Sequence, residues 1–125
     1  MTHNQTLSVR IALAEDEPAS RSILVQLLKA LGHDVVYAAA DGSELVDECP
    51  TDNIDLVVVD LDMPVMDGLA TAEFMALKGI PVILVSGHAD ADELVIDHEP
   101  VAACVRKPAS LQDLRQAISV ALNIS

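Results

Sequence analysis

Short apolar runs alternate along this chain with segments in which apolar residues recur every three or four positions. A short, nearly continuous apolar run is typical of a strand buried on both faces, and the wider spacing is typical of an amphipathic helix. The predicted strands are Val9–Ala14, Val35–Ala39, Asp55–Asp60, Pro81–Ser86 and Ala102–Arg106. The predicted helices are Pro18–Leu31, Ser43–Cys49, Gly68–Lys78, Asp90–His98 and a last helix that begins after Ser110.

Residues that begin and end helices support these bounds. Pro18 suits a first helical turn, and Gly32 follows the last apolar residue of that helix as a candidate C-cap. Ser110 is a candidate N-cap, and Asp113 three residues later makes a weak form of the capping box. Between the second strand and the second helix, Asp41-Gly42 is predicted to turn the chain.

Five strands that alternate with five helices predict an α/β fold, with one five-stranded parallel sheet and helices on both faces. Because crossover connections are right-handed, we expect the chain to wind in both directions from the first strand. No internal repeat, linker or low-complexity segment is visible. We therefore expect a single domain over residues 1–125, with a polar N-terminal tail at residues 1–7.

The composition narrows the chemistry of the core and of any partner. Hydrophobic residues make up 51% of the 125 residues and aromatic residues only 2%, which predicts an aliphatic core. The formal net charge of -13 disfavours nucleic acid and anionic membranes, because both attract clustered Lys and Arg. This charge suits a divalent cation or a basic patch on another protein.

The cysteines and the N-terminus bear on the compartment. Cys49 and Cys104 lack metal-ligand spacing and do not form the framework of a disulfide-rich domain, which favours a reducing compartment. No export signal and no apolar run of membrane-spanning length is visible. We therefore expect a cytoplasmic protein.

Polar side chains follow four of the predicted strands at their carboxyl ends. Parallel strands bring these ends to one edge of the sheet, where ligands bind in open α/β sheets. The end residues are Glu15-Asp16, Asp60 with Asp62 just beyond, Ser86-Gly87 and Lys107-Pro108. The sequence therefore predicts that carboxylates, a hydroxyl and an ammonium group converge at this edge.

Such a cluster favours a metal-dependent phosphoryl site. Two carboxylates about 4 Å apart repel by roughly 4 kcal/mol at an effective dielectric constant near 20, so several together need a cation. Mg²⁺ prefers oxygen ligands and is typically held by one or two carboxylates plus phosphate oxygens. Asp60, at the centre of the sheet, is best placed to attack phosphorus, because carboxylates can form an acyl phosphate. Lys107 and Ser86 would then contact the phosphoryl oxygens.

The motif D-L-D-M-P-V-M-D-G after the third strand, with the upstream acid pair, Ser86-Gly87 and Lys107-Pro108, resembles the response-regulator receiver domains of two-component signalling. The resemblance spans Ser8 to Ala121, and the chain is similar to the single-domain chemotaxis and sporulation receivers. It implies a flavodoxin-like, doubly wound sheet with strand order 2-1-3-4-5. It also implies that Asp60 accepts a phosphoryl group.

The same resemblance implies how the acids share a Mg²⁺ ion. Asp16 and Asp60 would be direct ligands, Glu15 would act through water, and Asp62 would offer its backbone carbonyl. Glu15 departs from the Asp that is usual at its position, and its side chain reaches further.

For the remaining residues, the resemblance implies that Ser86 is the switch hydroxyl and that Lys107 binds the phosphoryl group. It also implies a cis Lys107-Pro108 bond, which proline permits at modest cost. Two positions depart from the family pattern, because Cys104 and Ala109 stand where aromatic residues are usual. We expect Cys104 to pack as a small hydrophobic residue.

The leading functional hypothesis is a stand-alone receiver that catalyses only its own phosphorylation and dephosphorylation. It would act through protein contact, either as a signalling switch or as a phosphorelay intermediate. A histidine kinase or phosphotransfer protein would be the donor. An unknown downstream protein would bind the face formed by the fourth helix, fifth strand and fifth helix.

Two alternatives remain. A small haloacid-dehalogenase-like phosphatase would also place Asp60-Leu61-Asp62 after an apolar strand, but it needs a second acid pair after the lysine. Only Asp113 follows Lys107, inside a predicted helix. The other alternative is a pseudo-receiver that is never phosphorylated and serves as an interaction module.

Overall fold

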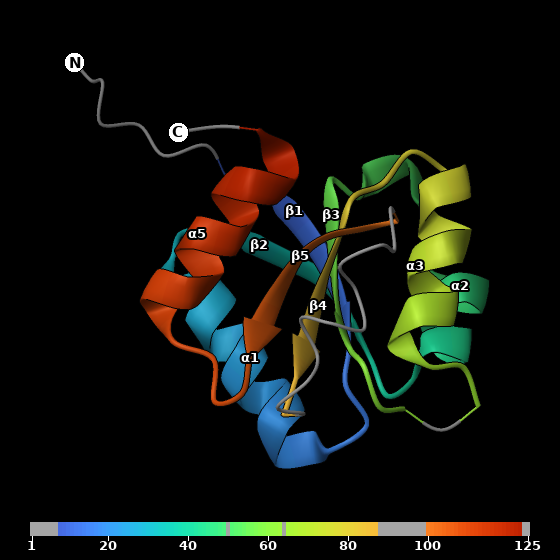
Figure 1. Cartoon of the computed structure of the whole chain (residues 1–125), viewed down its shortest axis with the longest axis horizontal. Coiled ribbons are helices and arrows are strands. Elements are labelled where there is room, and N and C mark those ends of the chain that lie inside the picture. The colour runs from blue at the N-terminus through green and yellow to red at the C-terminus, as the bar shows by residue number, and fades with distance from the viewer. Residues whose placement is uncertain (1–7, 50, 64, 88–99, 124–125) are drawn as a thin grey trace.

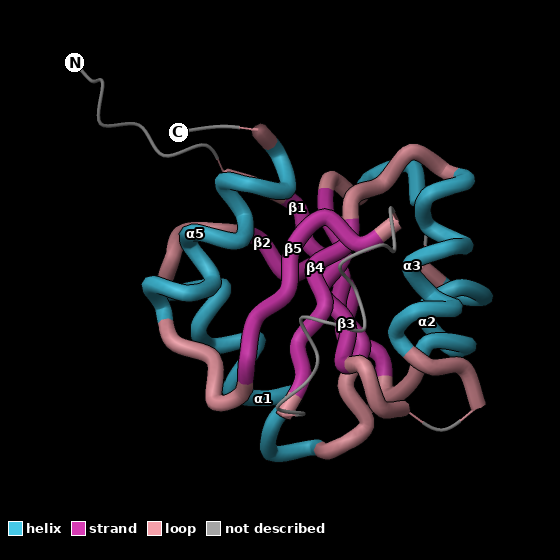
Figure 2. The backbone as a smooth tube through the Cα atoms, viewed as in Figure 1, coloured by secondary structure: helices cyan, strands magenta, loops and turns pink. Residues whose placement is uncertain are grey.

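The computed structural model describes residues 8–49, 51–63, 65–87 and 100–123. These residues form a five-stranded parallel sheet in the order β2-β1-β3-β4-β5, which confirms the predicted fold class and strand order. Figures 1 and 2 show the strands running through the middle of the molecule. The strands are β1 (Arg10–Ala14), β2 (Asp34–Ala39), β3 (Leu56–Asp60), β4 (Val82–Ser86) and β5 (Val101–Arg106). The helices are α1 (Pro18–Ala30), α2 (Gly42–Glu48), the 3₁₀ turn η1 (Thr51–Asn53), α3 (Gly68–Leu77) and α5 (Leu111–Leu122).

The helices form a layer on each face of the sheet. Helices α1 and α5 cover one face and α2 and α3 the other (Figure 1). Every residue of β3 and β4 is buried, as expected for central strands covered on both sides. Two aliphatic clusters result: one includes Leu28 and Leu114 beneath α1 and α5, and the other includes Leu45 and Met75 beneath α2 and α3.

The observed element bounds differ from the predicted ones by at most one residue. Helix α2 begins at Gly42, because the Asp41 side chain accepts a hydrogen bond from the Glu44 N–H and acts as its N-cap. The side chain of Ser110 caps α5 by accepting from the Asp113 N–H, as predicted. The sequence pattern did not predict η1. The predicted helix Asp90–His98 lies outside the described residues.

Gly68 lets α3 begin directly against the strand that carries Asp60. A methyl group at this position would lie 2.6 Å from the backbone oxygen of Asp60 and 2.7 Å from Cδ1 of Leu84. The Gly68 N–H donates to the backbone oxygen of Leu61 at 3.1 Å, and this hydrogen bond also holds the start of α3 close to the end of β3. Only glycine fits here without a shift of backbone, so this residue helps to set the position of the end of β3.

Val65, in the loop between β3 and α3, has a φ of 72° and is 83% exposed. A positive φ is unusual for any L-residue and more so for a β-branched one. The loop after β3 therefore holds a backbone conformation that valine does not favour, and its apolar side chain projects into solvent.

Candidate acidic site at the carboxyl edge of the sheet

Three acidic side chains meet where β1 and β3 end. Glu15 and Asp16 directly follow β1, and Asp60 is the last residue of β3. One carboxylate oxygen from each lies within 4.8 Å of the other two. Glu15 is fully buried and Asp60 is 6% exposed, whereas Asp16 is exposed to solvent. The predicted convergence of acids at this edge is thus present in the structure.

Both oxygens of the Glu15 carboxylate are hydrogen bonded. Oε2 accepts from the Glu17 N–H at 3.1 Å, and Oε1 accepts from the Ser20 hydroxyl at 3.1 Å. The backbone oxygen of Glu15 accepts from Nη1 of Arg21 at 2.9 Å. These donors all come from the start of α1, so the helix orients the side chain and main chain of Glu15 together.

Lys107 reaches the acids from the loop after β5. Its Nζ lies 2.7 Å from Oε1 of Glu15 and 3.5 Å from Oδ2 of Asp60. The Lys107 N–H donates to the backbone oxygen of Ser86 at 2.8 Å, and the Lys107-Pro108 peptide is cis, as predicted. In this structure the lysine therefore pairs most closely with Glu15 and only loosely with Asp60.

The charges of the cluster displace the pKa values of its members. Burial, and then the charge of Glu15, raises the pKa of Asp60 to about 6, although Lys107 and a backbone hydrogen bond from Asp62 oppose this. Burial also acts to raise the pKa of Glu15, but hydrogen bonds from Lys107, Glu17 and Ser20 outweigh it and the pKa is lowered. Burial acts to lower the pKa of Lys107, and its two acidic partners raise it overall. Asp60 is therefore the acid whose negative charge is least well compensated.

The other two predicted site residues also lie at this edge. Ser86 ends β4 and is 1% exposed; its neighbour Val85 is the register partner of Asp60 on the adjacent strand. Asp62 lies two residues beyond β3 and is exposed. Every residue predicted to act in the site thus ends a strand or follows one within two residues, at the carboxyl edge of the sheet.

The donor set suits a hard divalent cation such as Mg²⁺. It consists of carboxylate oxygens, and the raised pKa of Asp60 reports negative charge that Lys107 does not fully neutralise. Mg²⁺ binds such oxygens and keeps several waters, which the exposed side of the cluster at Asp16 allows. The residues present therefore fit the ion that the sequence predicts.

Sequence reasoning did not assign a function to Ser20 or Arg21. Both contact Glu15, one through the carboxylate and one through the backbone oxygen. These residues follow Glu15 by five and six positions. Helical spacing does not predict a contact with Glu15, because Glu15 itself precedes the helix. Only the turn from β1 into α1 brings them back onto the acid.

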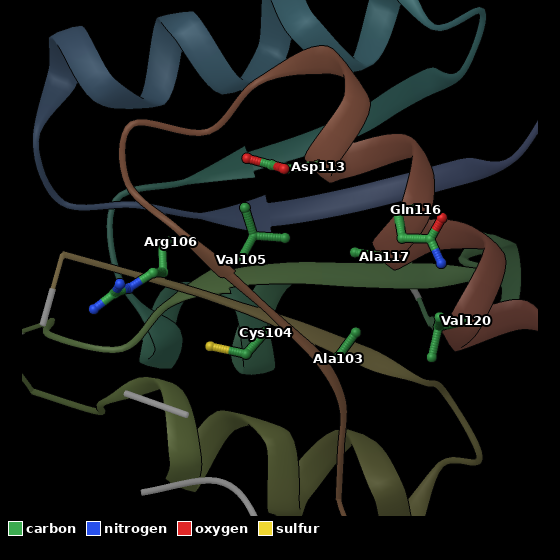
Figure 3. Close-up of a pocket in the computed structure, with 8 residues that line it drawn as sticks. All are labelled: Ala103, Cys104, Val105, Arg106, Asp113, Gln116, Ala117 and Val120. Carbon is green, nitrogen blue, oxygen red and sulfur yellow. The ribbon is translucent and has the colours of Figure 1, made fainter. Parts of the chain in front are cut away.

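Cys104, which replaces the usual aromatic residue, lies on β5 and is half-buried. Its side chain packs against the core cluster beneath α2 and α3, while the neighbouring Val105 belongs to the cluster beneath α5. Figure 3 shows the two side chains on opposite sides of β5, with Ala117 of α5 near Val105. Cys104 thus packs as a small hydrophobic residue, as predicted.

Comparison with protein families gives a match to the response regulator receiver domain over residues 11–119. The chain belongs to this family. It is therefore a receiver domain of the kind used in two-component signalling.

Individual relatives agree with this assignment. The transcriptional regulatory protein PdtaR of Mycobacterium tuberculosis is 35% identical over 117 residues, which cover 91% of this chain but 57% of PdtaR. A receiver domain protein from Clostridium thermocellum superposes with a TM-score of 0.77 at 29% identity, over 94% of this chain and 95% of the other. A chain of the CheX-CheY-BeF3-Mg²⁺ complex from Borrelia burgdorferi gives 0.80 at 25% identity, over 95% and 92%. Among the described helices, none is both long and apolar enough to cross a membrane.

Proposed function

We propose that this receiver accepts a phosphoryl group on Asp60 in a Mg²⁺-dependent reaction, from a histidine kinase or histidine phosphotransfer protein. The observation that carries the proposal is the position of Asp60. It is a buried carboxylate beside Glu15 and Lys107, with a pKa raised to about 6 by burial and by the charge of Glu15. At neutral pH it is ionised, available as a nucleophile, and short of compensating positive charge.

In the proposed reaction, a carboxylate oxygen of Asp60 forms a bond to phosphorus as the bond from phosphorus to the donor nitrogen breaks. The electron pair of the broken bond stays on the imidazole of the donor, which then takes a proton from solvent. The transferred group brings negative oxygens beside Lys107, whose Nζ already lies 3.5 Å from Asp60. The ammonium group would hold one of these oxygens as a point charge.

Mg²⁺ would be held by Asp16 and Asp60, with Glu15 acting through water and Asp62 through its backbone carbonyl, and it would neutralise charge on the phosphoryl oxygens. The buried hydroxyl of Ser86, on the strand next to Asp60, would donate to a further oxygen. The crystallised complex from Borrelia burgdorferi includes BeF3 and Mg²⁺, which supports the metal and phosphoryl chemistry by similarity.

Transfer of Lys107 from Glu15 to the phosphoryl group would alter the loop after β5 and hence the surface next to it. We propose that one domain fills the chain and that a partner protein reads this change at the face that includes β5 and α5. The chain matches only 57% of PdtaR, so we do not assign the signalling output of that longer relative to this chain.

The test is intact-protein mass spectrometry after incubation with acetyl phosphate, with Mg²⁺ or with EDTA. The expected result is one added phosphoryl group that requires Mg²⁺ and is lost in Asp60→Asn. Asp67→Asn is the matched control, because Asp67 caps α3 outside the cluster and asparagine also caps helices. Continuous release of phosphate from small phosphomonoesters would instead favour a phosphatase, and a protein that gains no phosphoryl group would be a pseudo-receiver.

A further inference from the structure

The Ser20 hydroxyl makes a hydrogen bond that the chemistry assigned above does not use. Ser20 lies in the first turn of α1, and its Oγ donates to Oε1 of Glu15 at 3.1 Å. The same oxygen accepts from Nζ of Lys107 at 2.7 Å. One buried carboxylate oxygen therefore has two side-chain donors, one charged and one neutral.

Helix capping does not account for this hydroxyl. The cap of α1 is made by the side chain of Glu17, which accepts from the backbone N–H of Ser20 and leaves the Oγ uninvolved. Nor does the packing demand a polar group. Ser20 lines a cavity of about 320 Å³ together with Ile23, Leu24 and Lys107, where an apolar side chain would also fit. The contact that distinguishes serine here is the one to Glu15.

We propose that Ser20 is a positioning residue, whose hydroxyl holds the Glu15 carboxylate in place for the Mg²⁺ cluster and keeps it there when Lys107 moves to the phosphoryl group. The second part rests on the proposed phosphorylation of Asp60. The first part concerns the metal alone and stands independently of it.

The physical reason is the satisfaction of a buried charge. While Lys107 is bound, Oε1 of Glu15 has two donors and Oε2 has the Glu17 N–H. If Lys107 leaves, Ser20 still provides a donor to Oε1, so each oxygen keeps one partner. Without the hydroxyl, departure of the lysine would leave Oε1 of a fully buried acid without its two side-chain donors, which is costly for a charged acceptor. The carboxylate would then rotate, or the lysine would stay.

The direct test measures Mg²⁺ affinity by isothermal titration calorimetry with no phosphoryl donor present. Residues that orient metal ligands typically contribute about 10–100-fold to affinity, and we expect Ser20→Ala to bind Mg²⁺ about tenfold more weakly. Ser22→Ala is the matched control, because Ser22 is exposed on the same helix, and it should bind as the parent protein does.

A second pair of variants separates the hydroxyl from the shape of the side chain. Ser20→Thr keeps a hydroxyl and should restore affinity, whereas Ser20→Val has the same shape without one and should bind as weakly as Ser20→Ala. In a Glu15→Ala background, removing the Ser20 hydroxyl should cause no further loss, because its target is gone. Unfolding in urea, followed by circular dichroism, verifies that each variant is folded.

Two results would overturn the proposal: equal affinities for the Thr and Val variants, or an equal loss on removing Ser20 with and without Glu15. A parent protein that fails to bind Mg²⁺ would overturn it as well. If the parent binds Mg²⁺ but gains no phosphoryl group from acetyl phosphate, the proposed function fails while the metal data still decide on Ser20. If it is labelled, Ser20→Ala should be labelled more slowly than Ser20→Thr at saturating Mg²⁺.

Discussion

Replacing Asp60 by Asn should stabilise the Mg²⁺-free protein, because the folded structure disfavours the ionised form of the Asp60 carboxyl group. Burial and the charge of Glu15 raise its pKa from the ordinary value of 3.8 to about 6. At 1.36 kcal/mol per pKa unit, this displacement corresponds to roughly 3 kcal/mol of destabilisation above pH 6. Asparagine keeps the shape and removes the charge. It also weakens the contacts with Lys107 and the Asp62 N–H, so we expect a net gain of about 2 kcal/mol at pH 8.

The sign of the pH dependence follows from linkage. Between pH 4 and 6 the unfolded chain has released the Asp60 proton and the folded protein still holds it, so folded-state stability falls as pH rises. The advantage of Asp60→Asn should therefore be absent below pH 4, grow through this window and be complete above about pH 6. Thermal unfolding in EDTA at several pH values measures it, and the melting temperature should rise by roughly 3–5 °C per kcal/mol for a domain of this size.

Two further measurements test whether the gain in stability comes from removing the charge of Asp60. Asp55→Asn should have the opposite sign, because hydrogen bonds from Arg10 hold the pKa of Asp55 below its ordinary value, so its charge stabilises the fold above that value. Saturating Mg²⁺ should shrink or reverse the advantage of Asp60→Asn, because the ion stabilises the parent by roughly 2.7 kcal/mol at a hundred times its dissociation constant. If Asp60→Asn were no more stable than the parent at pH 8 in EDTA, the reasoning about uncompensated acids would be wrong.

Three further changes have expected outcomes, each measured by urea unfolding. Lys107→Met should destabilise the protein by about 3 kcal/mol at pH 8, because it leaves the fully buried Glu15 without its charged partner; an unchanged midpoint would contradict the pairing. Gly68→Ala should cost about 1–3 kcal/mol, because its methyl group would lie 2.6 Å from a backbone oxygen of β3. Gly87→Ala is its control and should be nearly neutral, because the added methyl group meets no atom of the described residues within 4 Å. Burial lowers the pKa of His33 from 6.5. The neutral imidazole therefore contributes stability that is present above pH 6.5 and is lost as pH falls towards the lowered pKa. We expect His33→Gln to lose less stability than the parent protein between pH 7 and 5.

The fold and the location of the site were predictable because both follow from local patterns. Continuous apolar runs specify buried parallel strands, and a parallel sheet necessarily gathers the carboxyl ends of its strands at one edge. Glu15, Asp16 and Asp60 could therefore be placed together without any knowledge of side-chain contacts. The cap at Ser110 followed from equally local chemistry.

The details that depend on side-chain reach were not predictable. That Lys107 prefers Glu15 to Asp60 reflects the longer side chain of a glutamate at that position and the path of the loop after β5. Ser20 meets Glu15 because the chain turns sharply between β1 and α1, which no periodic pattern records. The positive φ of Val65 runs against the preference of valine, so local propensity points away from it.

The central claim is that Asp60 itself becomes the phosphorylated residue, and reductive trapping tests it most directly. The protein is incubated with acetyl phosphate and Mg²⁺ and then treated with borohydride, which reduces an acyl phosphate to the alcohol and so converts aspartyl phosphate to homoserine. Peptide sequencing by mass spectrometry then locates the product. We predict homoserine at position 60 alone, only when both acetyl phosphate and Mg²⁺ are present. Homoserine at another acid such as Asp16 or Asp62, or none in a folded protein that binds Mg²⁺, would contradict the account.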